Sequence, residues 1–140
     1  MRKLVVISLF LVCVAIITGA FIYRQMHDSK EFVKDFHQVL RGEAAASAYD
    51  SFCPVIQRQL SKSDVEKIEK AYTQNSSHEI TYNSKLDPSA VYDKYVKGYR
   101  ESGPSKTNTI VYRTGKIDVG VVLEAENNSY CVLAIETKLY

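Results

Sequence analysis

Several residue types that mark particular protein classes are scarce or missing in this chain. It has no tryptophan, three prolines, six glycines and three cysteines among 140 residues. So little Pro and Gly excludes a collagen-like repeat, and so few cysteines exclude a disulfide-rich miniprotein. The cysteines form no C-x-x-C pair and no cluster with histidine, the usual ligand patterns of zinc. We therefore expect no metal and no cofactor.

The chain also lacks an excess of charge of either sign. Lys and Arg number 18 against 16 Asp and Glu, which gives a formal net charge of +2. A nucleic-acid-binding domain usually carries a strong basic excess, so this balance argues against nucleic acid as a partner. The length fits a single domain, and a hydrophobic content of 46% is enough for a core.

Sequence motifs for catalysis are missing as well. The chain has neither a glycine-rich phosphate loop nor a nucleophile elbow. A histidine that acts as a general base needs a partner and a shielded site. Of His27, His37 and His78, only His78 is a candidate for such a pair, with Asp118 on the polar side of a predicted strand. We expect no catalytic residue.

What the chain does have is a long uncharged run near its start. No charged residue occurs from Leu4 to Ile22, and a helix of that length reaches about 28 Å, close to the thickness of the hydrocarbon core. Arg2 and Lys3 precede the run, which favours a cytoplasmic N-terminus. The run predicts a transmembrane helix over residues 4–22. A signal peptide cleaved after Ala20 is the alternative.

This topology sets the expected domain organisation and location. Residues 1–27 would form a cytoplasmic stub, the anchor and a linker, and residues 28–140 an exported α+β domain. We expect a single-pass protein of the bacterial inner membrane, with this domain in the periplasm or outside the cell. The membrane, contacted through residues 4–22, is then the first expected partner.

Two of the three cysteines fall in the expected exported domain. Cys13 lies within the uncharged run, which leaves Cys53 and Cys131 as a pair. An even number of cysteines in an oxidising compartment suggests a disulfide. Two buried free thiols would also satisfy the sequence, because free cysteine behaves as a small apolar residue. Both interpretations stay open at this point.

Helical spacing of apolar residues dominates the first half of the expected domain. Asp28 and Glu31 match a capping box, and Gly42 is a typical residue at the end of a helix. The spacing predicts a helix between these points, a second from Glu43 to about Phe52, a short turn from Val55 to Leu60 after Pro54, and a third from Ser61 to about Asn75.

The second half changes to alternating apolar and polar residues, which is the period of strands. The alternation predicts strands over residues 79–83, around Ile110 and Tyr112, from Ile117 to Ala125 and from Cys131 to Leu139, with turns at Thr114-Gly115 and Asn127-Asn128. The last three form a β-meander in which Val121 and Leu133 face the core. We expect an α+β fold, with about three helices packed on a curved antiparallel sheet of about four strands.

Tyrosines recur at helical spacing between the first predicted strand and the meander. Tyr92, Tyr95 and Tyr99 share one face of a predicted helix from about Pro88 to Tyr99, with Lys94 and Lys97 between them. Tyrosine is favoured at protein interfaces, so this stripe is a candidate partner surface. Packing of the same stripe on the sheet is the alternative, and a strand over residues 92–101 remains open.

The order of these features resembles a known superfamily. The pattern consists of Gly42-Glu43, Ala48-Tyr49, Phe52 and Gln59-Leu60-Ser61, followed by a terminal meander. It resembles small cell-envelope members of the nuclear transport factor 2-like superfamily, which have cystatin-like α+β folds. The resemblance covers residues 28–140. It implies a helix-covered curved sheet, often with a conical cavity, but it does not imply one activity.

The expected function is a membrane-tethered binding or scaffold module outside the cytoplasm. It would engage another envelope protein, a small ligand in the cavity, or further copies of itself. One alternative is a small enzyme that uses the cavity, and another is a subunit of a secretion or conjugation apparatus. An enzyme would need a buried Asp, Glu or His on the inward surface, where the predicted positions are nearly all apolar.

Overall fold

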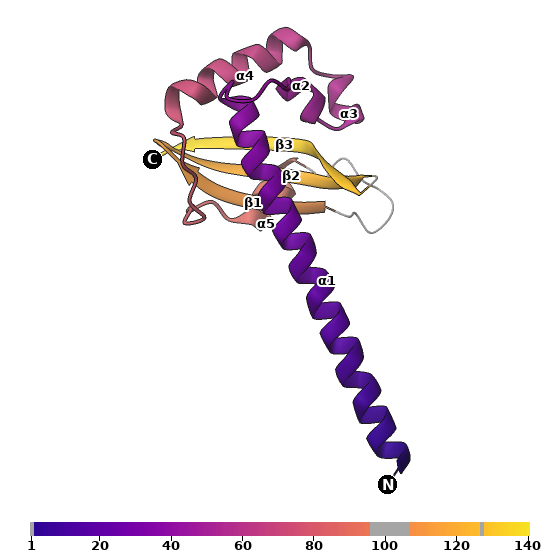
Figure 1. Ribbon diagram of the computed structural model, residues 1–140. Helices are drawn as coiled ribbons and strands as arrows, with labels where there is room; N and C mark the ends of the chain where they lie inside the picture. Colours follow the sequence, from indigo (N-terminus) through magenta and orange to yellow (C-terminus); the bar gives the residue numbers. More distant parts are fainter. Residues whose placement is uncertain (1, 96–106, 127) are drawn as a thin grey trace.

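The computed structural model describes residues 2–95, 107–126 and 128–140. It confirms the α+β class, because helices come first in the chain and a β-meander follows them (Figure 1). The elements are α1 (Arg2–Leu40), α2 (Ala48–Ser51), α3 (Pro54–Gln57), α4 (Lys62–Asn75), α5 (Pro88–Tyr95), β1 (Thr107–Thr114), β2 (Ile117–Glu126) and β3 (Ser129–Leu139).

Within the described ranges, the sheet has three antiparallel strands in the order β1-β2-β3. About four strands were expected, and the prediction of a strand over residues 79–83 is wrong. That segment meets β1 only at an isolated bridge between Thr81 and Arg113. Just before the bridge, the carbonyl of Glu79 accepts a hydrogen bond from the side chain of Thr114 at 2.8 Å. A hydrogen bond from a side chain of β1 therefore holds this segment in place of a continuous backbone ladder.

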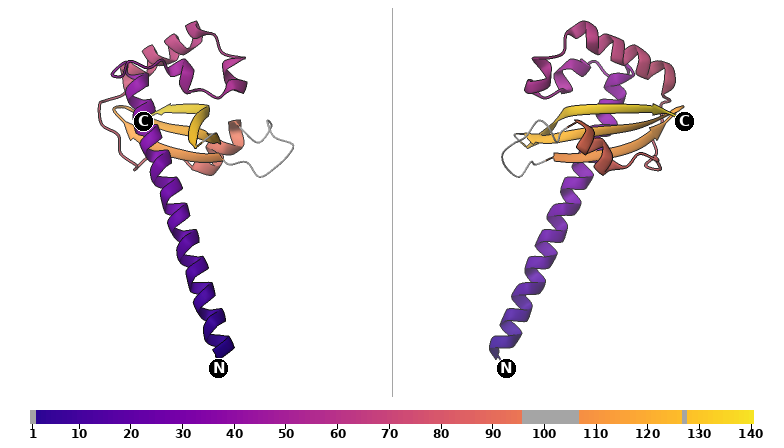
Figure 2. Two further views of the ribbon diagram at one scale, coloured as in Figure 1. Left: turned by 45° about the vertical axis from the view of Figure 1, so that its right-hand side comes forward. Right: turned by 180° about the vertical axis from the view of Figure 1, so that it is seen from behind.

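Helices cover both faces of the sheet. Figures 1 and 2 show α1 crossing one face and α5 lying on the other. Val121 belongs to the main core on the α1 face, whereas its neighbour Val122 packs with Val91 of α5. Gly120 lets α5 approach closely, because a Cβ at that position would lie 3.0 Å from the Val91 side chain. The main core therefore lies between α1, α4 and the sheet.

A β-bulge interrupts the register between β2 and β3. Val122 is paired with Ala134 but Leu123 with Val132, so one extra residue is inserted in β3. Val132 is fully buried in the main core, while Leu133 packs in the cluster on the α5 face. The expectation that Leu133 faces the same core as Val121 is therefore wrong. Strict alternation cannot anticipate a bulge, which reverses the side-chain parity beyond it.

The two helices expected before Gly42 are one continuous helix, α1. No glycine or proline lies between Gly19 and Gly42, so nothing in the backbone ends the helix near Asp28. The expected domain boundary at residue 28 therefore falls inside α1. Gly42 ends the helix as predicted, with φ +70°, and the amides of Gly42 and Glu43 bond to the carbonyls of Val39 and Gln38.

The transmembrane helix expected over residues 4–22 is not supported. Within the part of the chain that the structure describes, no helix is long and apolar enough to cross a membrane.

The sequence signals predicted the starts of α3 and α4 correctly, but they predicted too long a helix at α2. α4 begins with the expected capping box, in which Ser61 and Asp64 bond to each other's backbone amides. α3 begins at Pro54, as expected. The helix predicted from Glu43 to Phe52 shrinks to the single turn α2, because Ser47 caps it and accepts a hydrogen bond from the Tyr49 amide.

The cysteine pair forms a disulfide, as one of the two open interpretations predicted. Cys53 and Cys131 are bonded, with their Cα atoms 4.8 Å apart. The Cys53 amide also donates to the carbonyl of Val132 at 2.9 Å, and Phe52 forms a bridge with the same residue. The disulfide thus ties the α2–α3 corner to the outer edge of β3.

The core position of Leu123 provides a direct test of this architecture. We expect Leu123→Ala to lower the free energy of unfolding by about 2–5 kcal/mol, because its fully buried side chain leaves a cavity. The exposed Lys116→Ala should change it by less than about 0.5 kcal/mol. Urea unfolding of both variants with the disulfide intact measures this difference. Equal stability of the two variants would contradict the packing.

Candidate functional site

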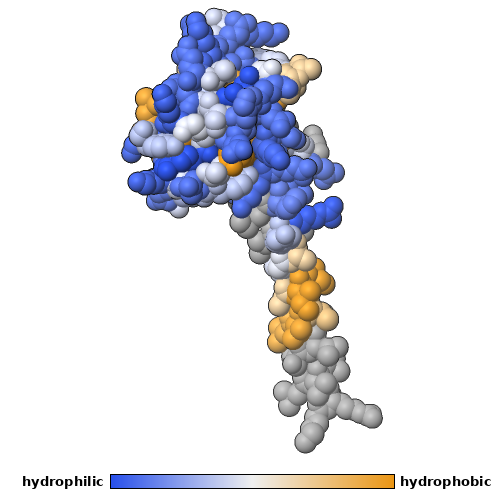
Figure 3. Space-filling view, turned by 60° about the vertical axis from the view of Figure 1, so that its left-hand side comes forward, coloured by the Kyte–Doolittle hydropathy of each residue, from blue (hydrophilic) through white to orange (hydrophobic). Residues whose placement is uncertain are grey.

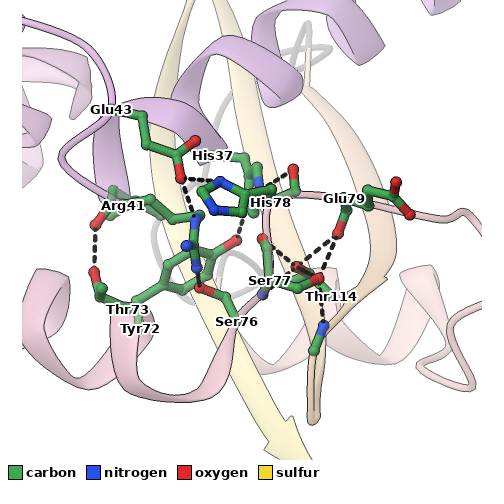
Figure 4. Close-up of polar contacts among 12 residues, drawn as sticks. His37, Arg41, Glu43, Tyr72, Thr73, Ser76, Ser77, His78, Glu79 and Thr114 are labelled. Carbon is green, nitrogen blue, oxygen red and sulfur yellow. Dashed lines mark hydrogen bonds and ion pairs between the residues drawn. The ribbon is translucent and has the colours of Figure 1, made fainter.

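A polar cluster lies where the ends of α1, α4 and β1 meet (Figure 4). α1 contributes His37 and Arg41, α4 contributes Tyr72, and β1 contributes Tyr112. The segment after α4, residues 76–79, runs through the same place. Because three separate elements supply its members, the cluster forms only when the domain is folded.

The centre of the cluster is a chain of three buried side chains. The Tyr72 hydroxyl lies 2.7 Å from His37 Nδ1 and 2.8 Å from the Tyr112 hydroxyl. His37 Nε2 lies 3.3 Å from the carbonyl oxygen of His78, which can only accept. Nε2 therefore carries the hydrogen. Nδ1 accepts from Tyr72, and Tyr72 accepts from Tyr112.

Burial keeps this chain neutral. His37, Tyr72 and Tyr112 are only 1%, 2% and 0% exposed. Desolvation lowers the pKa of His37, and the positive charge of Arg41 lowers it further. Desolvation also raises the pKa of both tyrosines well above their ordinary value. The imidazole is therefore uncharged and both phenols keep their protons at neutral pH.

A charged rim closes the cluster at the surface. The Glu43 carboxylate accepts from Arg41 Nε at 2.7 Å and pairs with His78 Nδ1 at 2.5 Å. Arg41 also donates to the Ser76 hydroxyl at 2.8 Å. The hydrogen bond from Arg41 is the main reason that the pKa of Glu43 is lowered. The His78 side chain is 79% exposed, so solvent reaches this rim.

The tip of the β1–β2 hairpin is fastened to the same segment. The Thr114 hydroxyl contacts the carbonyls of Ser77 and Glu79 at 3.0 and 2.8 Å. The Lys116 amide donates to the carbonyl of Asn75 at 2.8 Å. Gly115 has φ +55°, and a Cβ there would lie 2.8 Å from the carbonyl carbon of Ser76. The close approach of the hairpin to α4 therefore requires glycine.

This arrangement is suited to holding three elements together rather than to catalysis. A general acid or base has to come within hydrogen-bond reach of a substrate. The buried His37 and Tyr72 are already bonded, and every buried side-chain nitrogen or oxygen in the described ranges has a partner. The exposed pair of Glu43 and His78 is the part of the cluster that solvent reaches.

The structure separates His78 from Asp118, the two residues that the sequence suggested as a general base and its partner. His78 pairs with Glu43, whereas Asp118 bonds Arg113 through both carboxylate oxygens at 2.8 and 3.0 Å. Arg113 in turn lies over the ring of Tyr140, 3.9 Å from its centroid. Asp118 therefore braces the end of the sheet.

The tyrosine stripe lies partly within the described residues. Tyr92 and Tyr95 of α5 are half-buried and pack against the cluster of Val91 and Val122, which matches the packing alternative. Lys94 pairs with Glu136 of β3 at 2.8 Å. Tyr99 and Lys97 lie outside the described residues, so the partner-surface interpretation stays a prediction.

Among the residues that the structure describes, two groups of side chains bring metal-ligand atom types within 4.8 Å of one another. In the first, Cys53 and Cys131 are already bonded to each other beside Glu124. The second lies exposed on one turn of α1 and consists of His27, Asp28 and Glu31. Exposed carboxylates of this kind are common on helices, and neither group resembles a closed four-ligand site.

Sequence reasoning missed the His37–Tyr72–Tyr112 network. The sequence singled out His37 only as one of three histidines and Tyr112 only as part of a predicted strand. A buried tyrosine hydroxyl needs a partner, and this was the one available signal that a polar group lies opposite. Nothing in a single sequence says which residue that partner is.

Comparisons with family models, with curated proteins and with solved structures found no match for this chain. The resemblance to the nuclear transport factor 2-like superfamily therefore remains a prediction.

The two glycines with positive φ form a matched pair for a stability test. Gly42→Ala should cost about 1–2 kcal/mol, because a left-handed backbone is strained for alanine, yet nothing lies within 4 Å of the new Cβ. Gly115→Ala should cost more, since its Cβ also collides with the backbone of Ser76. Chemical denaturation ranks the two variants. A smaller loss for Gly115→Ala would contradict the close contact.

The buried histidine predicts a pH dependence of stability. Its pKa is lowered from an ordinary value of 6.5, so the folded state binds fewer protons than the unfolded state at mildly acid pH. The free energy of unfolding should therefore fall as the pH drops below 6.5, the ordinary pKa of histidine. His37→Gln, which keeps a donor and an acceptor, should reduce this fall.

Urea unfolding at neutral and mildly acid pH checks the expectation. His78→Gln is the control, because that exposed ring lies at the rim and its removal should leave most of the fall in place. If His37→Gln shows the same loss of stability on acidification as the unmodified chain, His37 is not its source.

Proposed function

We propose that this chain is an exported binding or scaffold module that engages another protein through the exposed apolar part of α1. We call residues 11–20 of α1 the arm. Its side chains are all exposed, and the helix carries them away from the domain (Figures 1 and 3).

The concentration of exposed apolar side chains on the arm carries this proposal. Large hydrophobic residues are between 45% and 68% exposed there: Leu11, Val12, Val14, Ile16 and Ile17. In Figure 3 the arm is the main hydrophobic surface of that view, and most of the domain above it is hydrophilic. Contiguous apolar surface of this kind is costly in water and usually marks an interaction site.

The chemistry of the arm indicates what kind of partner it fits. It contains no charged residue, and the Thr18 hydroxyl is satisfied by the carbonyl of Val14 at 2.6 Å. The arm therefore offers a partner nothing but apolar contact and shape. Charged residues follow it, beginning at Arg24, and would lie at the rim of the contact. We infer a protein partner with an apolar groove.

Two further observations support this function. The disulfide between Cys53 and Cys131 favours an oxidising compartment outside the cytoplasm. The polar cluster at His37 is buried and fully paired, so it supports a rigid domain better than an enzyme. A rigid domain that displays an apolar helix is suited to assembly.

The free thiol of Cys13 provides a direct test, because it lies exposed on the arm. In the purified chain a maleimide should label Cys13 readily. In an extract of the native cells, a bound partner should slow this labelling, and a photocrosslinker attached to Cys13 should give one discrete adduct. Ile16→Glu should restore fast labelling and abolish the adduct, because a carboxylate cannot enter an apolar groove without a large cost.

A matched reporter separates partner binding from general crowding. In a Cys13→Ser background, Lys34→Cys places a thiol on the exposed face of α1 beside the domain. That thiol should react at the same rate in both samples. If Cys13 also reacts equally fast in both, the arm has no partner and the proposal fails.

A further inference from the structure

The hydrogens of the buried network at His37 are matched with acceptors one to one. Its donors are His37 Nε2 and the hydroxyls of Tyr72 and Tyr112. Their acceptors are the His78 carbonyl, His37 Nδ1 and the Tyr72 oxygen, at 3.3, 2.7 and 2.8 Å respectively. The hydrogen bonds therefore run in one direction, from Tyr112 through Tyr72 and His37 to His78.

A proton on His37 Nδ1 would upset this match, because it adds a donor and removes an acceptor. Nδ1 would then donate to Tyr72, and the Tyr72 hydroxyl would have to donate to Tyr112. Among the described residues the Tyr112 hydroxyl has no second acceptor, and Tyr112 is 0% exposed. Protonation would therefore leave a buried hydroxyl hydrogen unpaired in addition to burying a charge, and both are costly.

The charges around His37 do not offset this cost. The titratable groups that face its ring from the neighbouring elements are Arg41 and Glu43 at the end of α1, Tyr72 of α4, His78 after α4 and Tyr112 of β1. The positive charge of Arg41 opposes a second one on His37. The Glu43 carboxylate favours it, but that carboxylate is already bonded to Arg41 and paired with His78.

The segment of residues 76–79 is the part of the surroundings that can yield. α1, α4 and β1 bury apolar side chains in the main core, whereas no side chain of residues 76–79 belongs to it. Polar contacts hold the segment (Figure 4), among them the bond from the Ser77 amide to the Thr114 hydroxyl at 3.0 Å. Segments held in this way open locally at a lower cost than the core.

We propose that His37 and residues 76–79 form a proton-operated latch, which is closed while the imidazole is neutral and opens when His37 takes up a proton. Moving the segment away removes the His78 carbonyl from the ring and lets water accept hydrogen bonds from the charged imidazole. The hairpin tip at Gly115 is released at the same time, because it is bonded to this segment. The latch lies at the end of α1 opposite to the arm, so it does not rest on the function proposed above.

Hydrogen exchange of single amides measures the opening. The amides of Ser77, Gly115 and Lys116 are bonded across the latch. If His37 titrates at its ordinary pKa of 6.5 in the open state, the protection factors of these amides should fall severalfold, and at most about tenfold, from about pH 7.5 to 5.5. The Cys53 amide is bonded to Val132 at the other end of the sheet and should keep its protection.

Two histidine variants identify the group that takes up the proton. His37→Gln keeps a donor and an acceptor but cannot be protonated, so the protection of the three latch amides should no longer depend on pH. His27→Gln removes an exposed histidine of α1 outside the latch and should leave the fall unchanged. Circular dichroism verifies that both variants are folded.

Nuclear magnetic resonance of the unmodified chain provides a measurement that needs no variant. The His37 ring should carry its hydrogen on Nε2 at neutral pH, because the His78 carbonyl can only accept. Protonation of His37 should then coincide with the loss of protection at Ser77, Gly115 and Lys116.

Three results would overturn the proposal. If the Cys53 amide loses protection together with the three latch amides, acid unfolds the whole domain and no local latch exists. If His37 takes up its proton while those amides stay protected, the closed network accommodates the charge. A fall in protection that persists in His37→Gln has a source other than His37.

Discussion

The domain depends on the burial of the last turns of α1 against one face of a three-stranded sheet. Val33, Phe36 and Leu40 of α1 are almost fully buried there. A sheet of three strands in a chain this small cannot exclude water from its own apolar face, so a helix has to cover it. α1 therefore covers the core with its last turns and projects from the domain with its first part.

The polar network at His37 determines how α1 sits on the sheet. An apolar contact tolerates small rotations, whereas a hydrogen-bonded chain through Tyr72 to Tyr112 requires one geometry. A buried polar group without its partner is costly, so misdocked arrangements of α1 and α4 are penalised. The network therefore contributes to the uniqueness of the fold, and the exposed rim of Glu43 and His78 closes it from solvent.

These features together favour assembly over catalysis. The side chains of His37, Tyr72 and Tyr112 are buried and bonded to one another, whereas the apolar arm is exposed. The projecting arm is the apolar surface that the proposed protein partner would cover.

Local signals alone were sufficient for several parts of this molecule. Gly42 ended α1, Ser61 began α4, and the alternation after residue 107 marked the meander, because each depends on backbone preferences within a few residues. The candidate site was not predictable in this way. Its three central side chains come from α1, α4 and β1, and only the fold brings them together.

Tertiary contacts determined the structure of those segments whose local sequence signals were ambiguous or misleading. Residues 79–83 alternate between apolar and polar types as a strand does. They are nevertheless held against β1 by a hydrogen bond from the Thr114 side chain and one isolated bridge, and not by a continuous backbone ladder. The bulge opposite Leu123 moved Leu133 to the second face, because sheet packing, rather than the alternation within β3, set the register. The sequence by itself determined which segments become helices or strands over short distances. Contacts between distant segments decided strand pairing, the continuity of α1 past Asp28 and which polar groups met in the core, because those choices depend on burial that no single segment achieves alone.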